Sequence, residues 1–448
     1  MHSRLAQSWQ HLRESLWFVP TLLVTVSFAL AYGLIQFDDH TSWQGEKQFP
    51  LLFGNGAEGA RGMLTAIAGS MLTVAALTFS LTLSAISQVS SQYSPRVLRN
   101  FMRDRINQVV MGYFVGVFAY CLIVLGTIRG TDDQKFVPAT AVLAGLVLAL
   151  GGVAALIFFI HHIAESLQTG TIVRRIYTET SRAIDALFPD AFGESVDDQR
   201  VDEPAHRFAP DHPDWRPVRA GQVGYLQSVG VEGLLHWATQ HEVLMRVEVA
   251  IGAFVTENTV LLSVRGGPEP ADPGWTDELR QHVSIGPHRN LQQDAAFGLQ
   301  QLVDIALKAL SPGVNDTTTA IMAVDYLGAL MAQLAGRGFP SPLRSDGQHP
   351  RVLVRAAGFD DYARLAFDLP RINAHGNHAV LMRLSRALAS TATEAGPTRR
   401  AVLRQQAGLL RAQADRTLAS DYEKTAFRNV HDALSETWAG LTGARGEG

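Results

Sequence analysis

Four long apolar runs occupy the first third of the chain, at about 17–36, 63–92, 108–128 and 137–163. Each is long enough to cross a hydrocarbon core as a helix, which takes roughly 20 residues. Charged residues occur throughout positions 170–448. The pattern predicts an α-helical membrane domain with four transmembrane helices, followed by a cytosolic α+β domain built from a small β unit plus helices.

Domain boundaries follow from the same pattern. Leu5, Trp9, Leu12 and Leu16 recur at helical spacing before the first run, which predicts an interfacial amphipathic segment over 1–16. We place the transmembrane domain at 17–165 and the cytosolic α+β domain at 218–448. Between them, residues 166–217 form a predicted juxtamembrane helix and linker, because positions 189–217 are rich in Pro and Asp and lack a period.

Lys and Arg in the short flanks orient the helices, since cytoplasmic loops carry the excess of positive charge. The flanks of one side hold nine: Arg4, Arg13, Arg96, Arg99, Arg103, Arg105, Arg174, Arg175 and Arg182. Those of the other side hold four: Lys47, Arg61, Arg129 and Lys135. Both termini are therefore expected in the cytoplasm.

Hydroxyl side chains gather on one face of the second run. At about 100° per residue, that face carries Gly62, Gly69 and six hydroxyl residues, and the opposite face carries Leu64, Ile67, Met71 and Ala75. The six are Ser70, Thr73, Ser80, Ser84, Ser87 and Ser91. Such a face suits a tight interface between helices, or a water-lined path. We keep both interpretations, with these six residues as candidate pore-lining positions.

Four arginines follow this run: Arg96, Arg99, Arg103 and Arg105. Positive charge at a cytoplasmic flank contacts lipid phosphates in many membrane proteins. Repeated around a symmetric oligomer, the same residues would form an electropositive vestibule that concentrates anions. The two roles are compatible.

The later half shows mixed periodicity. Residues 223–264 predict a strand, a short helix and two strands, and "IGAFVTENTVLLSV" resembles the hairpin of biotinyl and lipoyl domains. No lysine stands at its turn, where Asn258 replaces glycine, so we expect no attached cofactor. Residues 297–310 form an apolar helix face, and 398–419 and 421–441 predict two closing helices.

Two short stretches flank the helix predicted over 297–310. His288 and Arg289 precede it, and Asn315 and Asp316 follow the stop at Ser311–Gly313. Helix capping and an ordinary surface turn explain them adequately. The alternative is a cytosolic anion or nucleotide site on which the helix N-termini, His288 and Arg289 converge.

Several segments carry a family resemblance: "LTVAALTFSLTLSAISQVSSQYSPRVLRNFMRDR", "FFIHHIAESLQ", "VGYLQSVGVEGLL" and "LQQDAAFGLQQLVDIALKALSPGVNDTTTA". Together they resemble DUF2254, a family of predicted bacterial integral membrane proteins. The resemblance implies a bacterial inner-membrane protein and brings no activity or catalytic residues.

Composition narrows the function further. The net charge of -4 argues against a nucleic-acid partner, and Cys121 is the single cysteine. We find no Walker A, H-E-x-x-H, G-x-S-x-G or kinase motif, and expect no enzyme, metal or cofactor. We therefore predict a homo-oligomeric channel in the lipid bilayer that prefers small anions, with a cytosolic gating or assembly domain. The alternative is a membrane-anchored sensor or scaffold whose cytosolic domain binds a ligand or protein.

Overall fold

A computed structural model describes residues 17–40, 56–92, 105–129, 136–166, 168–189, 206–267 and 274–440. Contacts divide the chain into two compact units, Met1–Thr171 and Ile172–Gly448. We call them the membrane unit and the C-terminal unit. The interfacial segment predicted over 1–16 lies outside the described residues.

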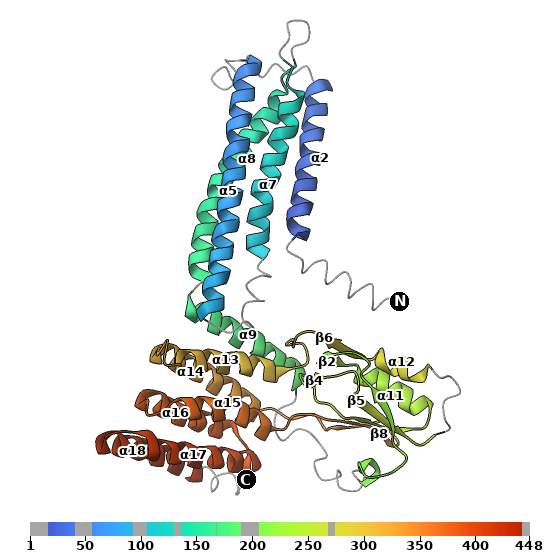
Figure 1. The fold of residues 1–448 in the computed structure, drawn as a ribbon, viewed down its shortest axis with the longest axis vertical. Coiled ribbons are helices and arrows are strands. Elements are labelled where there is room, and N and C mark those ends of the chain that lie inside the picture. Colours follow the sequence, from blue (N-terminus) through green and yellow to red (C-terminus); the bar gives the residue numbers. More distant parts are fainter. Residues whose placement is uncertain are drawn as a thin grey trace. The chain divides into compact units, whose positions relative to one another are not determined.

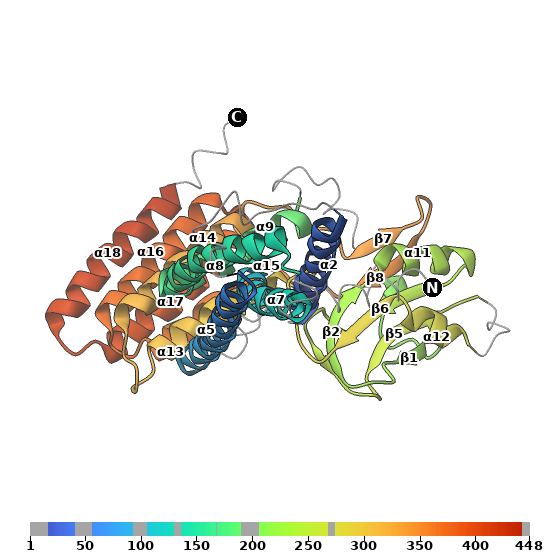
Figure 2. The same ribbon diagram turned by 90° about the horizontal axis from the view of Figure 1, so that it is seen from above.

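The membrane unit is a bundle of long helices: α2 (Phe18–His40), α5 (Gly56–Gln92), α7 (Arg105–Thr127) and α8 (Ala139–Ser166) (Figure 1). Helices α7 and α8 each pack against the other three, and seen from above α7 lies between α2 and α5 (Figure 2). Glycines permit this packing. A Cβ at Gly112 would come within 2.8 Å of Pro20 Cα, and one at Gly116 within 2.6 Å of Ser27 Oγ.

Hydrogen bonds between helices fix one end of this bundle. Asp38 Oδ2 accepts hydrogen bonds from the backbone N–H groups of Thr140, at 3.0 Å, and Ala141, at 3.1 Å. The carboxylate thereby supplies an acceptor to the first turn of α8, where backbone donors lack helical partners. Tyr120 Oη donates to Ala141 O at 2.7 Å, and Arg61 donates to Ile128 O at 2.7 Å.

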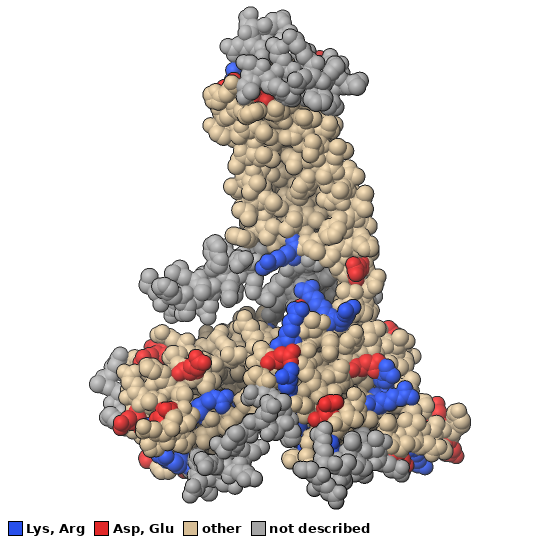
Figure 3. Space-filling model, turned by 180° about the vertical axis from the view of Figure 1, so that it is seen from behind, with Lys and Arg blue, Asp and Glu red and all other residues tan. Residues whose placement is uncertain are grey.

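Five helices in the described part of the chain are long and apolar enough to cross a membrane. Four are the helices of the membrane unit, and the fifth is α14 (Thr317–Ala335) of the C-terminal unit. On the face shown in Figure 3, the shaft of the membrane unit is almost free of charged atoms, whereas the C-terminal unit carries both signs.

The C-terminal unit contains two sheets. One has five strands in the order β1-β5-β3-β8-β7, and the other has three in the order β4-β2-β6. The strands are β1 (Arg216–Arg219), β2 (Gly224–Val229), β3 (Leu244–Val247), β4 (Phe254–Val255), β5 (Val260–Arg265), β6 (Val283–Gly286), β7 (Leu343–Ser345) and β8 (Pro350–Val354). Both sheets contribute to one apolar core with the short helices α11 (Val231–Gln240) and α12 (Trp275–Arg280). Trp237, Met245 and Leu262 are buried there.

Long helices complete this unit: α9 (Thr169–Leu187), α13 (Ala295–Ala309), α14, α15 (Phe359–Asn373), α16 (His378–Glu394), α17 (Pro397–Thr417) and α18 (Asp421–Gly440). Polar side chains cap three of them, because Asp294, Asp316 and Asn377 accept hydrogen bonds from the first turns of α13, α14 and α16. Helices α17 and α18 confirm the two predicted closing helices.

The predicted hairpin over "IGAFVTENTVLLSV" is wrong. Strand β4 pairs with β2, whereas β5 pairs with β1 and β3 in the other sheet. Asn258 also does not adopt the left-handed conformation in which it would replace glycine. Among the described non-glycine residues, φ is positive at Glu242, Asn315 and His375. The alternation of apolar residues located both strands but did not determine their partners.

Candidate functional site

Helix α5 contacts its own chain through one face. Leu64, Met71, Ala75 and Thr78 are buried on this side. Two glycines of α8 receive the larger side chains, since an added Cβ at Gly145 would meet Leu64 Cδ2 at 3.1 Å and one at Gly152 would meet Met71 Sδ at 3.0 Å. The prediction that Leu64, Met71 and Ala75 share the apolar face is confirmed.

The opposite face of α5 consists of small and hydroxyl residues, and all of them are exposed. They are Gly62, Ala66, Gly69, Thr73, Ala76, Ser80, Ser84 and Ser87, which recur at intervals of three and four residues. We call this set the outward face of α5. Neither Gly62 nor Gly69 has anything within 4 Å of an added Cβ. Within one chain, therefore, the outward face is not a packed helix interface.

Larger apolar side chains flank the outward face. Leu77 is 50% exposed on one side, and Leu72 and Phe79 are 49% and 52% exposed on the other. Thr73 Oγ1 donates a hydrogen bond to Gly69 O at 2.9 Å, so the hydroxyl group is already paired with a backbone carbonyl of its own helix. An exposed face of small and hydroxyl residues between larger apolar side chains suits a second helix or water better than lipid chains.

The structure describes five of the six predicted pore-lining side chains and one of the four predicted vestibule arginines. Ser70, Thr73, Ser80, Ser84 and Ser87 are exposed on α5, although Ser70 stands beside the outward face rather than on it. Ser91 belongs to α5, but its side chain lies outside the described residues. Arg96, Arg99 and Arg103 also lie outside them, and Arg105 is the exposed first residue of α7.

Arg289 is engaged within the C-terminal unit. Its guanidinium donates to both carboxylate oxygens of Asp294, at 2.7 and 2.9 Å, and lies 5.3 Å from the ring centroid of Phe297. The Asp294 side chain is only 4% exposed. It also accepts from Phe297 N at 3.1 Å and so caps α13. At the neighbouring position, His288 O accepts from Gln227 Nε2 at 2.6 Å.

Asn315 and Asp316 form the turn between α13 and α14. Asn315 has φ +47°, in the left-handed region that Asn tolerates better than most residues. Asp316 accepts from Thr319 N at 3.0 Å and from Thr319 Oγ1 at 2.5 Å. These hydrogen bonds lower the pKa of Asp316. The predicted capping role of Asp316 is confirmed.

The two pairs cannot form one anion site. Arg289 precedes the first turn of α13 and Asn315 follows its last turn. A helix of 15 residues separates them by about 22 Å at 1.5 Å per residue. The predicted convergence on a single phosphate therefore has to be abandoned.

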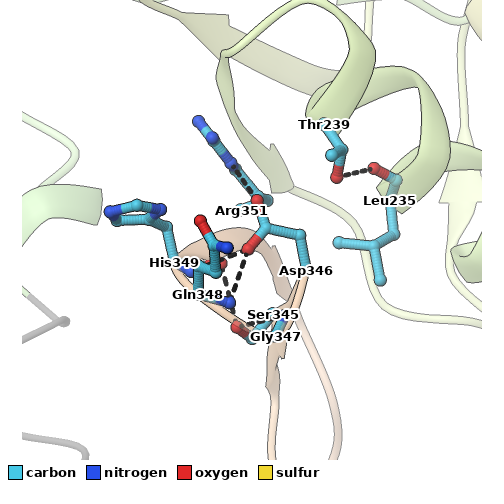
Figure 4. Close-up of polar contacts among 8 residues, drawn as sticks. All are labelled: Leu235, Thr239, Ser345, Asp346, Gly347, Gln348, His349 and Arg351. Carbon is cyan, nitrogen blue, oxygen red and sulfur yellow. Dashed lines mark hydrogen bonds and ion pairs between the residues drawn. The ribbon is translucent and has the colours of Figure 1, made fainter.

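A second polar cluster closes the turn between β7 and β8 (Figure 4). Asp346 accepts from the backbone N–H groups of Gln348 and His349, at 2.9 and 2.7 Å, and from Arg351 Nε at 2.8 Å. The hydrogen bond from Arg351, followed by those from the backbone, holds the pKa of Asp346 far below its usual range. Since Asp346 bonds to its own turn, we assign it a structural role.

Asn107 and Gln108 are functional candidates that the sequence interpretation missed. Both belong to the first turns of α7 and are buried, with 7% and 2% exposure. Their side-chain oxygens have no hydrogen-bond partner. The sequence feature that could have indicated them is the pair of adjacent amide residues at the start of the apolar stretch "INQVVMGYFVG".

Residues 13–390 match a sequence family described as predicted membrane protein (DUF2254). The chain belongs to this family. Its membership confirms the resemblance and identifies a membrane protein. An uncharacterized protein of Mycobacterium tuberculosis strain H37Rv is 33% identical to this DUF2254 protein over 424 residues, which cover 92% of the chain and 79% of the relative. An uncharacterized protein of Mycobacterium bovis matches to the same extent. No solved structure matches the chain.

Proposed function

We propose that this DUF2254 protein is the subunit of a homo-oligomeric membrane channel whose path is lined by the outward face of α5. The observation that carries the proposal is the position of this face. It lies opposite the contacts that α5 makes with its own chain, and it is small and hydroxyl along its described length.

Two physical arguments support assembly through α5. Small residues let helix backbones approach closely, and close approach is the main source of helix association in lipid. Spacing that alternates between three and four residues keeps one stripe facing a partner helix along its length. Copies of α5 arranged around an axis would turn their hydroxyls toward the centre and their apolar flanks toward neighbouring subunits.

Four helices cross the bilayer in this proposal, and α14 does not. Helix α14 packs against α13 and α16. Its Asp325 forms an ion pair with Arg383 of α16, and Gly328 lies so close to Ala387 that an added Cβ would meet the Ala387 Cβ at 2.8 Å. On the basis of the flanking charges, we propose that both termini and the C-terminal unit lie in the cytoplasm of a bacterium and that the protein lies in the inner membrane.

Selection among ions would come from the mouth of the path rather than from its wall. The outward face contains no carboxylate that could favour cations. Arg96, Arg99, Arg103 and Arg105 follow α5 in the sequence and supply positive charge at the cytoplasmic side. Because exposed charge is screened over about 8 Å at physiological salt, the preference for anions would be modest and would weaken as salt rises.

Ion flux from liposomes tests this function. Full-length protein should release chloride faster than potassium, and replacing both Arg96 and Arg99 by Gln should reduce that preference. A matched control replaces Arg386 and Arg404, which are exposed in the C-terminal unit, by Gln. It removes the same charge and should leave the preference unchanged.

Two results would count against the channel. If protein-containing liposomes release ions no faster than empty ones, conduction is excluded and the sensor or scaffold hypothesis takes its place. If the Arg96 and Arg99 variant conducts with an unaltered preference, the arginines do not select the ion.

A further inference from the structure

Residues of α5, α7 and α8 meet in layers that repeat every seven positions on α5 and α8 and after six positions on α7. An added Cβ at Gly145 of α8 would meet Leu64 of α5 at 3.1 Å and Tyr120 of α7 at 3.5 Å. Seven residues along α8, one at Gly152 would meet Met71 at 3.0 Å and Phe114 at 3.7 Å. Residue numbers rise together on α5 and α8 and fall on α7, so α7 is antiparallel to the other two.

The next layer in this register contains a polar pair. If the register continues for seven more residues on each helix, Thr78 of α5, Asn107 of α7 and Phe159 of α8 come to about the same level. Their burial agrees with this position, because the three residues are 1%, 7% and 0% exposed. Where the first two layers hold Leu64 and Met71 against aromatic residues, the third holds a hydroxyl and an amide.

The oxygen atoms near this layer present lone pairs. Asn107 Oδ1 and Gln108 Oε1 are buried without a hydrogen-bond partner. Thr78 Oγ1 donates to Val74 O at 2.7 Å, and Thr82 Oγ1 donates to Thr78 O at 2.8 Å, so both hydroxyl hydrogens point to the helix itself. A buried acceptor without a donor costs free energy, and that cost is recovered when a donor or a cation binds.

We propose that Asn107 and Thr78, with Gln108 beside them, bind an alkali metal cation inside the membrane unit. Neutral amide and hydroxyl oxygens replace the hydration shell of such ions, as backbone carbonyls do in selective membrane proteins. A divalent ion is a poorer fit because it is usually held by carboxylates, and this layer contains none.

This site is independent of the proposed channel path. Thr78 lies on the buried side of α5, whereas the path would run along the outward face. An ion bound between α5 and α7 would hold the two helices together at the level where α7 begins. It would therefore stabilise the membrane unit whether or not the protein conducts.

Thermal unfolding of the full-length protein in detergent tests the site. Sodium chloride, potassium chloride and N-methyl-D-glucamine chloride are compared at equal ionic strength, because the bulky organic cation cannot enter a buried layer. One alkali ion should raise the Tm saturably, by on the order of 3 °C at ten times its half-saturating concentration. Whichever of sodium and potassium gives the lower half-saturating concentration is the preferred ion.

Variants assign the effect to this layer. Asn107→Leu should remove the cation dependence and Thr78→Val should weaken it. Gln301→Leu serves as the matched control, since Gln301 is another buried amide whose Oε1 has no partner, in the C-terminal unit. It should change the Tm without changing its dependence on the cation.

Three outcomes would overturn the proposal. The wild-type Tm could be equal in all three salts, which would leave only water or no ligand at the amides. The Asn107→Leu protein could keep the full cation dependence. If that variant does not fold, equilibrium dialysis of wild-type protein against radioactive sodium and rubidium decides, and binding below one ion per chain contradicts the site.

Discussion

Replacing Asp294 separates two roles that one side chain combines. Its carboxylate caps α13 and forms a two-point ion pair with Arg289. Asp294→Asn keeps an oxygen that can cap the helix but removes the charge, whereas Asp294→Ala removes both. The surroundings allow little rearrangement, because an added Cβ at Gly252 would already lie 2.4 Å from Asp294 Oδ2.

The expected loss of unfolding free energy follows from the burial of the ion pair between Asp294 and Arg289. Removing one partner of a buried ion pair costs about 3–5 kcal/mol, and losing a helix N-cap costs about 1 kcal/mol. Arg289 retains 22% side-chain exposure, so water can solvate it in part after the change. We therefore expect Asp294→Ala to cost about 4 kcal/mol and Asp294→Asn about 2 kcal/mol. The alanine variant should lower the Tm by on the order of 10 °C.

Thermal unfolding of the full-length protein measures these differences, and hydrogen exchange at the amide of Phe297 reports the cap directly. The exchange of this amide should accelerate in Asp294→Ala more than in Asp294→Asn. If Asp294→Asn unfolds at the wild-type temperature, the ion pair contributes nothing to stability. Arg289 would then again be a candidate ligand for an anion.

Three further predictions address topology, capping and pH. Reporter fusions after residues 45, 100, 132 and 180 should lie outside, inside, outside and inside the cytoplasm in turn, and a cytoplasmic reporter at 45 would contradict the orientation. Asp316→Ala should cost about 1 kcal/mol of unfolding free energy, and an unchanged Tm together with lost anion binding would contradict the capping role. Burial lowers the pKa of His431 below its ordinary value of 6.5, so its contribution to stability is present above pH 6.5. It is lost as the pH falls from 6.5 through the lower pKa of the folded protein, because in that range the unfolded chain takes up the proton first. His431→Leu should flatten this dependence in urea unfolding, and an unaltered pH profile would exclude His431 as its cause.

Helical periodicity predicted the membrane unit well because its elements are long. Placing the second apolar run at 100° per residue separated Leu64, Met71 and Ala75 from Thr73, Ser80 and Ser84, and the structure buries the first set and exposes the second. Periodicity does not reveal which helix covers which face. The sequence therefore could not show that α7 and α8 cover the apolar side of α5 and leave the hydroxyl side exposed.

Interactions between particular side chains were harder to predict than the helices that carry them. His288 and Arg289 were predicted as candidate ligand residues because the sequence did not show that Asp294, an N-cap residue, also pairs with Arg289. Only the observed start and end of α13 show that these residues and Asn315 lie at opposite ends of one helix. The polar layer at Thr78 and Asn107 depends on the register of three helices, which a single sequence does not give.

Single cysteines along α5 distinguish a hydrated path from a dry helix interface. In a background with Cys121 replaced by Ser, cysteines at Thr73, Ser80 and Ser84 sample the outward face, and cysteines at Met71 and Ala75 sample the buried face. In native membranes, the outward cysteines should react with a charged, membrane-impermeant thiol reagent and cross-link between subunits on oxidation, while the buried ones should do neither. Cross-linking without reaction would show a dry helix interface and contradict the path, and the absence of both would contradict assembly through α5 altogether.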